Sequence, residues 1–211
     1  MPVVLFVTIA TLASFALGTR ANVRAGERAA RWLQEGLPIV SDKTTMTWIG
    51  SAALMLKMAK AKGPYRSAEV LFSFEPRDLV LMWLFAHWQG RRDVMIFRGI
   101  LTATPNFELE IFDPQGWMNN EVAHQVQQKT WKSVNLAQAT NLRAYYTGDL
   151  DAETVHTLAA LATQSGGKLT RLSIRRSLPN VQVSWLLPDA QRVSARALFR
   201  DVREIGQRAV A

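Results

Sequence analysis

The chain begins with an uninterrupted apolar stretch, because residues 2–18 (PVVLFVTIATLASFALG) contain no charged side chain. As a helix this stretch is roughly 25 Å long, slightly shorter than the ~30 Å hydrocarbon core of a bilayer. Three interpretations compete for it: a membrane-spanning anchor, a signal peptide cleaved near Ala16-Leu17-Gly18, and a buried core helix. The anchor interpretation places seven large apolar side chains in the bilayer: Val3, Leu5, Phe6, Ile9, Leu12, Phe15 and Leu17.

The charges that flank the apolar stretch favour the anchor. A signal peptide has basic residues before its apolar part, whereas here the basic cluster follows it. This cluster has Glu27 as the one acid among four arginines: Arg20, Arg24, Arg28 and Arg31. By the positive-inside rule these arginines stay in the cytoplasm, so the N-terminus lies outside or in a lumen. We therefore predict that residues 1–36 form a single-span anchor and a basic juxtamembrane helix, followed by a cytoplasmic domain.

An α+β pattern begins after the anchor. Residues 46–62 are apolar and then basic, and their pattern does not distinguish helix from strand. Apolar alternation and β-rich composition predict three strands: 68–74, 92–103 and 107–111. The motif Glu75-Pro76-Arg77-Asp78 predicts the start of a helix, and because the following DLVLMWLFAHW is apolar on nearly every side, we expect that helix to be buried. A polar helix is expected over 119–128.

The same order of elements recurs about 75 residues later. Strand, helix, strand, strand and helix are expected in turn over residues 142–148, 153–164, 168–176, 181–185 and 190–208. Asp149 and Asp151 precede the first of these helices and give it an acidic start. We infer an internal duplication of this unit over residues 67–128 and 140–208, with chance similarity as the alternative. The predicted fold class is α+β: a transmembrane helix followed by one α+β domain over residues 46–211, built from two strand–helix–strand–strand–helix units.

Residues that could catalyse a reaction or bind a metal are few. The absence of cysteine excludes thiolate zinc sites, iron–sulfur clusters and a cysteine nucleophile. Glu121 and His124 have the spacing of carboxylate-bridged metal sites, but the second pair that such sites need is missing. Glu108 and Glu110 fit a solvated strand face, and His87 fits a core position. We therefore predict no enzyme and no catalytic, metal or cofactor site.

The charge balance predicts an acidic partner. The chain carries 25 basic and 17 acidic residues, a formal net charge of +8, none of it in the apolar stretch. Arginine favours bidentate phosphate contacts, so anionic lipid headgroups, ribosomal or other structured RNA, and an acidic protein surface all fit. A solvated face is the plainer alternative. The candidate partner-facing surface comprises ten arginines: Arg20, Arg24, Arg28, Arg31, Arg171, Arg175, Arg192, Arg196, Arg200 and Arg203.

Two stretches, residues 69–97 (EVLFSFEPRDLVLMWLFAHWQGRRDVMIF) and 167–188 (GKLTRLSIRRSLPNVQVSWLLP), resemble parts of the calumin family of coiled-coil-containing endoplasmic-reticulum proteins. The matching positions of the first stretch are Arg77, Asp78, Leu79, Asp93, Val94 and Ile96. The resemblance implies a single-pass protein whose cytosolic domain works with the translocon and ribosome during membrane-protein insertion. The family's acidic lumenal segment and long basic coiled coil have no counterpart here, so calcium binding and direct ribosome contact are not carried over.

From these patterns we expect a non-enzymatic, single-pass membrane protein. Its basic domain would be an accessory or adaptor subunit of a larger membrane complex, with insertion machinery as the first candidate. Two alternatives stay open: an accessory subunit of a respiratory or photosynthetic complex, and an enzyme that acts on lipids at the membrane surface.

Overall fold

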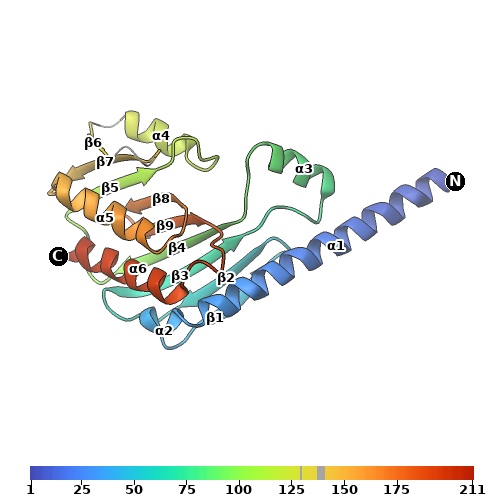
Figure 1. Ribbon diagram of the computed structural model, residues 1–211, viewed down its shortest axis with the longest axis horizontal. Helices are drawn as coiled ribbons and strands as arrows, with labels where there is room; N and C mark the ends of the chain where they lie inside the picture. The colour runs from blue at the N-terminus through green and yellow to red at the C-terminus, as the bar shows by residue number, and fades with distance from the viewer. Residues whose placement is uncertain (129, 137–140) are drawn as a thin grey trace.

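A long N-terminal helix leads into a helix-covered sheet. The computed structural model describes residues 1–128, 130–136 and 141–211. It begins with the 32-residue helix α1 (Pro2–Leu33), whose first half projects from the rest of the molecule, with the N-terminus at its free end (Figure 1). The predicted continuation of the helix beyond the apolar stretch is confirmed, because α1 runs unbroken from Pro2 to Leu33. The α+β class is confirmed as well.

Nine antiparallel strands form a single sheet in the described part of the chain. They are β1 (Thr45–Ile49), β2 (Ala53–Met58), β3 (Tyr65–Ser73), β4 (Val94–Leu101), β5 (Phe107–Phe112), β6 (Lys132–Asn135), β7 (Arg143–Gly148), β8 (Leu169–Ile174) and β9 (Val181–Leu186). Their spatial order is β1-β2-β3-β4-β9-β8-β5-β7-β6. The segment left undecided between helix and strand is thus the β1–β2 hairpin, which turns at Gly50 with a φ of 64°. Strand β6 was not predicted.

One face of the sheet carries the main core. Helices α2 (Leu37–Val40), α5 (Ala152–Gln164) and α6 (Ala195–Val210) pack there with the second half of α1, over buried side chains such as Phe72, Leu109 and Trp185. Leu33 of α1 is fully buried in this core, and the Trp32 indole donates a hydrogen bond to the Val193 carbonyl at 2.8 Å. The core is therefore continuous across the predicted boundary between residues 1–36 and 46–211.

The opposite face of the sheet is covered only in part. Helix α4 (Asn120–Gln127) lies there over β5 and β7, where Val122 and Val126 pack against Phe112 in a small separate cluster. Because side chains alternate along a strand, Phe112 points away from the main core, in the same direction as Glu108 and Glu110. This face therefore combines one apolar cluster with charged side chains.

Two helix starts illustrate how the sequence sets element boundaries. The predicted acidic start of α5 is confirmed, because Asp151 Oδ1 accepts a hydrogen bond from the Thr154 amide at 2.6 Å. This bond holds the pKa of Asp151 below its ordinary value. The expected start of the last helix near Ala190 is wrong: Ser194 caps α6, which begins at Ala195 and leaves Arg192 outside the helix.

The expectation that residues 78–88 form a buried helix is wrong. The helix α3 (Val80–Trp88) lies away from the sheet, beside the projecting part of α1 (Figure 1). Of its nine residues, all described, Ala86 alone is buried, whereas Leu81 and Trp88 are each 83% exposed. Residues 77–79 form a turn before the helix and Pro76 lies in the irregular segment that precedes this turn, so Pro76 does not open the first helical turn as expected.

The predicted duplication is not confirmed. The element order does recur, as β3-α3-β4-β5-α4 and then β7-α5-β8-β9-α6. The strand pairing differs, however, because β3 pairs with β4 whereas β7 pairs with β5 and β6. The first helices differ too, since α5 packs in the main core and α3 does not. Among the described elements, the sheet thus has no repeat of one three-strand unit.

Candidate membrane-facing site

The seven predicted anchor residues all lie on the projecting half of α1. Their side chains are exposed, from 48% for Phe15 to 72% for Phe6. Among the described residues, α1 is the one helix long and apolar enough to cross a membrane, and 6% of its most apolar window is buried in the protein. The interpretation as a buried core helix is therefore excluded, while an anchor and a signal sequence both fit this finding.

Small residues bring the middle of α1 close to the sheet domain. Gly18, Asn22 and Gly26 are buried and four residues apart, so they lie on one side of the helix. A methyl group on Gly18 would overlap the backbone carbonyl of Arg77, and one on Gly26 would overlap the indole ring of Trp48. The helix therefore packs against the domain with its backbone, a contact that larger residues would prevent.

A polar network reinforces this contact. The Arg77 guanidinium binds Asp93 through two hydrogen bonds of 3.0 and 2.9 Å, and it also donates to Asn22 Oδ1 at 3.0 Å. Asn22 is fully buried and donates in turn to the Glu75 carbonyl at 3.1 Å, while the Glu75 amide donates to Asp93 at 2.8 Å. Each buried polar group of this network has a partner, which low-polarity surroundings require. We call these four residues, together with Gly18 and Gly26, the joint.

The Glu75 carboxylate extends the joint to α3. It is buried, and Trp83 Nε1 donates to its Oε2 at 2.5 Å, with His87 Nδ1 3.1 Å from the same oxygen. His87 is half exposed, so its expected place in a hydrophobic core is wrong. Ser51 Oγ donates to Asp78 at 2.5 Å and fixes the turn before α3. These contacts orient α3 relative to α1 and the sheet.

Four of the six family-like positions, Arg77, Asp78, Leu79 and Asp93, lie in or next to the joint, whereas Val94 and Ile96 are buried in β4. Arg77 and Asp93 are the ion pair of the joint, and Asp78 holds the turn that follows it. Leu79 is exposed and belongs to the apolar surface of α3.

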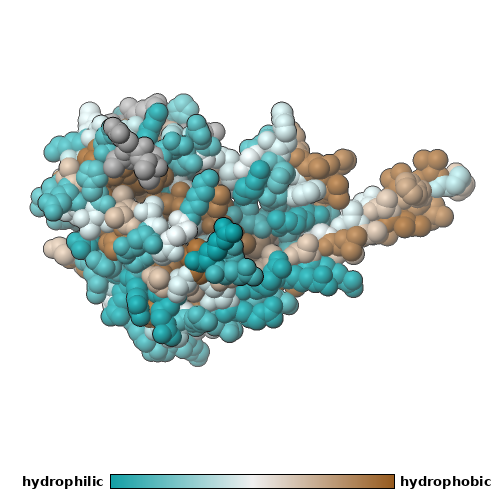
Figure 2. Space-filling view, viewed as in Figure 1, coloured by the Kyte–Doolittle hydropathy of each residue, from teal (hydrophilic) through white to brown (hydrophobic). Residues whose placement is uncertain are grey.

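Between α1 and α3 lies an apolar groove of about 570 Å³. Its lining comes from Phe6–Ser14 of α1 and from residues 78–82 at the start of α3. Figure 2 shows hydrophobic surface on the projecting helix and on the neighbouring α3, whereas the rest of the visible face is largely hydrophilic. The exposed apolar residues of α3 and its N-cap are Leu79, Val80, Leu81, Met82, Leu84, Phe85 and Trp88. Apolar side chains thus gather at one end of the molecule.

Eight of the ten candidate partner-facing arginines are exposed. Four lie on α1 just beyond the apolar half and have no acidic partner among the described residues: Arg20, Arg24, Arg28 and Arg31. Arg196, Arg200 and Arg203 lie on the outer side of α6, and Arg192 precedes it, 3.5 Å from Asp189. Arg203 donates to the Gly63 carbonyl at 3.2 Å.

The two remaining arginines are engaged inside the protein. Arg171 and Arg175 both bind Glu110, at 3.0 and 2.6 Å, and Ser173 Oγ donates to the same carboxylate at 2.7 Å. Glu110 is 1% exposed, so its expected place on a solvated strand face is wrong. The carboxylate lies on the β5 face opposite the main core, where side chains of the neighbouring β8 cover it. Arg171 and Arg175 therefore neutralise a buried charge.

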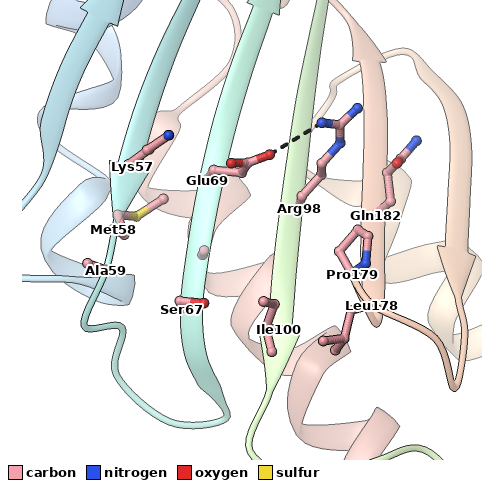
Figure 3. Close-up of a pocket in the computed structure, with 11 residues that line it drawn as sticks. Lys57, Met58, Ala59, Ser67, Glu69, Arg98, Ile100, Leu178, Pro179 and Gln182 are labelled. Carbon is pink, nitrogen blue, oxygen red and sulfur yellow. Dashed lines mark hydrogen bonds and ion pairs between the residues drawn. The ribbon is translucent and has the colours of Figure 1, made fainter.

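A second hollow lies on the partly open face of the sheet (Figure 3). It has a volume of about 590 Å³ and is lined by side chains of β2, β3, β4 and β9 and by the Leu178-Pro179 loop. Its carboxylate, Glu69, is bound to Arg98 at 3.3 Å. Its other polar side chains are Lys57, Ser67 and Gln182, and none of the described hydrogen bonds joins the Ser67 hydroxyl to a base in the lining.

Residues considered for metal binding lie apart from this hollow. Glu121 is exposed on α4 and accepts a hydrogen bond from Gln125 at 3.1 Å, while His124 is exposed one turn away. Within residues 1–128, 130–136 and 141–211, no group of three or more histidine and acidic side chains is arranged to hold a metal ion.

No protein-family model and no curated protein matches this sequence. The resemblance to the calumin family therefore stays a prediction, and the geometry has to support any functional proposal by itself.

Sequence reasoning missed the joint and the apolar surface of α3. The signal for the joint was present as three small or amide residues, Gly18, Asn22 and Gly26, at a four-residue spacing. The signal for α3 was the lack of any polar side on an apolar helix, which is typical of buried and of membrane helices alike.

Proposed function

We propose that the protein is a non-enzymatic, single-pass membrane protein whose basic domain serves as an accessory or adaptor subunit of a larger membrane complex. The projecting half of α1 is its anchor, the N-terminus lies outside or in a lumen, and the sheet domain lies in the cytoplasm. Machinery for membrane-protein insertion is the first candidate for the complex, on the strength of the calumin resemblance alone.

The observation that carries this proposal is the joint between α1 and the domain. The anchor continues without a linker into the helix that packs in the main core, and Gly18, Asn22 and Gly26 keep the two parts in direct contact. A flexible tether would let the domain tumble at the membrane, whereas this joint fixes the orientation of the domain relative to the anchor helix. Fixed orientation suits a subunit that presents one surface to its neighbours.

The same geometry supports an anchor over a cleaved signal peptide. Cleavage near Gly18 would cut α1 in the middle and remove Phe6–Ser14, against which the start of α3 packs. It would also uncover the apolar residues that line the groove on the α3 side. The four exposed arginines that follow Gly18 fit the headgroup region of the cytoplasmic leaflet.

The outer side of α6 is the proposed partner-facing surface. Arg196 and Arg200 are exposed and have no ion pair with a described residue, so their charges are available to an acidic partner. The joint fixes their height above the membrane, since α6 and the second half of α1 share one core. This surface is therefore the first to test.

We expect that affinity purification of the tagged full-length protein from gently solubilised membranes recovers translocon or ribosomal proteins at low salt. Replacing Arg196→Glu and Arg200→Glu together should reduce that recovery at least tenfold, because opposite charges would become like charges at the contact. Mass spectrometry of the recovered proteins measures both results.

The matched control is the pair Lys43→Glu and Arg66→Glu. Both residues are exposed, lie outside α6 and change the net charge by the same amount. Recovery should survive in this control. Equal losses in both variants, or recovery of the protein alone as a monomer, would contradict the proposal. If respiratory or photosynthetic subunits are recovered instead, the partner is that complex and not the insertion machinery.

A further inference from the structure

We propose that α3 is a second membrane-embedded element, which inserts into the leaflet next to the domain and attaches the protein to the bilayer at two places. The occupant of its exposed apolar surface is the acyl-chain region of the lipid bilayer. This inference rests on the proposed function in one respect, namely that the first half of α1 crosses the membrane.

The position of α3 along α1 sets its depth. The groove between the two helices is lined by α1 from Phe6 to Ser14, by Asp78 and Leu79 just before α3, and by Val80–Met82 of α3. Ser14 and Phe6 lie four and twelve residues before Gly18, which corresponds to about 6 and 18 Å along the helix axis. If residues 2–18 span the bilayer, the start of α3 lies at the depth of the hydrocarbon core of the bilayer.

The composition of α3 suits this depth. Apart from the half-exposed His87, its exposed side chains are leucine, valine, methionine, phenylalanine and tryptophan, and Leu81 and Trp88 are each 83% exposed. A nine-residue helix without a polar side is stable in water only when it is covered. Two of its three polar-tipped side chains, Trp83 and His87, turn toward buried Glu75, and the third, Trp88, is exposed.

The C-terminal end of α3 suits low-polarity surroundings, because three of its last four carbonyls accept hydrogen bonds from the chain itself. The carbonyls of Phe85, Ala86 and His87 accept hydrogen bonds from the amides of residues 89, 91 and 90, each at 3.0 Å. Arg92 donates a further bond of 2.9 Å to the His87 carbonyl. Helix ends normally leave such carbonyls to water, which is absent from hydrocarbon. Here the chain satisfies them itself.

Charged and aromatic residues mark the return of the chain to the headgroup region. Arg91 and Arg92 follow α3 after Gln89 and Gly90 and are exposed, and the Arg91 guanidinium lies 4.6 Å from the ring centroid of Trp117. Arginine and tryptophan are enriched at the interface between lipid and water. Together with Arg20 and Arg24 on α1, these arginines favour anionic headgroups.

A bilayer covers this surface better than a partner helix does. A helix in the groove would cover the start of α3 and one side of α1, leaving Leu84, Phe85 and Trp88 farther along α3 in water. The apolar surfaces of α1 and α3 adjoin at the groove, so lipid that surrounds the anchor reaches both. Two attachment points would also stop the domain from rotating about α1, so that α6 faces one direction.

The test uses the lack of cysteine in the natural chain. Single variants Leu81→Cys, Phe85→Cys, Leu12→Cys and Leu178→Cys of the full-length protein are labelled with the fluorophore NBD. The labelled proteins are placed in vesicles of phosphatidylcholine and phosphatidylglycerol that hold no other protein. Leu12 on α1 reports on the anchor, and Leu178, exposed on the loop beside the second hollow, is the control in water.

We expect blue-shifted emission and loss of iodide quenching at Leu81 and Phe85, as at Leu12, and full quenching at Leu178. Quenching at Leu81 and Phe85 with protection at Leu12 would overturn this inference and leave the anchor intact. Quenching at all four positions would overturn the anchor as well. Protection of α3 in native membranes but not in these vesicles would identify a protein partner and overturn the inference.

Discussion

Replacing Gly18 with alanine is expected to destabilise the packing of α1 on the domain by about 3 kcal/mol, the upper end of the usual cost of overpacking. The added methyl group would overlap the carbonyl of Arg77 and the amide of Asp78, which are backbone atoms and cannot turn aside. A loss of stability would be informative, because replacing glycine with alanine inside an ordinary helix has the opposite effect and stabilises the helix by up to about 1 kcal/mol.

A pair of spin labels measures this effect directly. Labels at Arg24→Cys on α1 and Arg200→Cys on α6, both exposed, should give one narrow distance distribution in the natural background. Gly18→Ala should broaden it. Gly26→Ala is the graded control, because its methyl group meets the ring of Trp48, a side chain that can shift. A narrow distribution in Gly18→Ala, together with increased thermal stability, would show that the joint does not depend on backbone contact.

Replacing Glu110 with glutamine is expected to lower the free energy of unfolding by about 3 kcal/mol, since removing one partner of a buried ion pair leaves the others uncompensated. Arg171 and Arg175 would keep their positive charges beside a neutral amide, and Ser173 would lose its charged acceptor. Urea denaturation of the full-length protein in detergent, followed by tryptophan fluorescence, measures the loss.

Glu108→Gln is the matched control on the same strand. Glu108 is half-buried, and its contact is a 3.4 Å hydrogen bond from the Arg176 amide, so we expect a change within about 0.5 kcal/mol. Equal losses in the two variants would mean that the buried cluster contributes no more than a surface carboxylate. If the free energy of unfolding falls by about 3 kcal/mol in Glu110→Gln and stays unchanged in Glu108→Gln, Arg171 and Arg175 are established as internal partners of Glu110.

Local pattern was sufficient for most of the secondary structure. Alternation along 68–74, 107–111 and 181–185 predicted β3, β5 and β9, and the acidic start at Asp151 predicted α5. The β1–β2 hairpin was undecided, because five- and six-residue apolar strands do not differ in periodicity from short buried helices.

The surroundings of Glu110 and of α3 are set by residues that are far apart from them in the sequence. Glu110 has an outward place on β5, as alternation predicts, but β8 lies beside it and brings Arg171 across the sheet. For α3, an apolar helix fits a core and a membrane equally well, and its exposure in the folded protein excludes the core. These contacts between residues far apart in the chain follow from the fold as a whole, so the pattern within a short stretch of sequence does not predict them.

The placement of α1 in the membrane is tested most directly by fractionation of a tagged full-length protein, with a carbonate wash, protease protection and intact mass. We predict the full-length mass, retention in carbonate-washed membranes, and digestion of the sheet domain by protease added from the cytoplasmic side. A soluble, exported protein whose mass lacks residues 1–18 would contradict this, and the anchor, the topology and the membrane role of α3 would fail together.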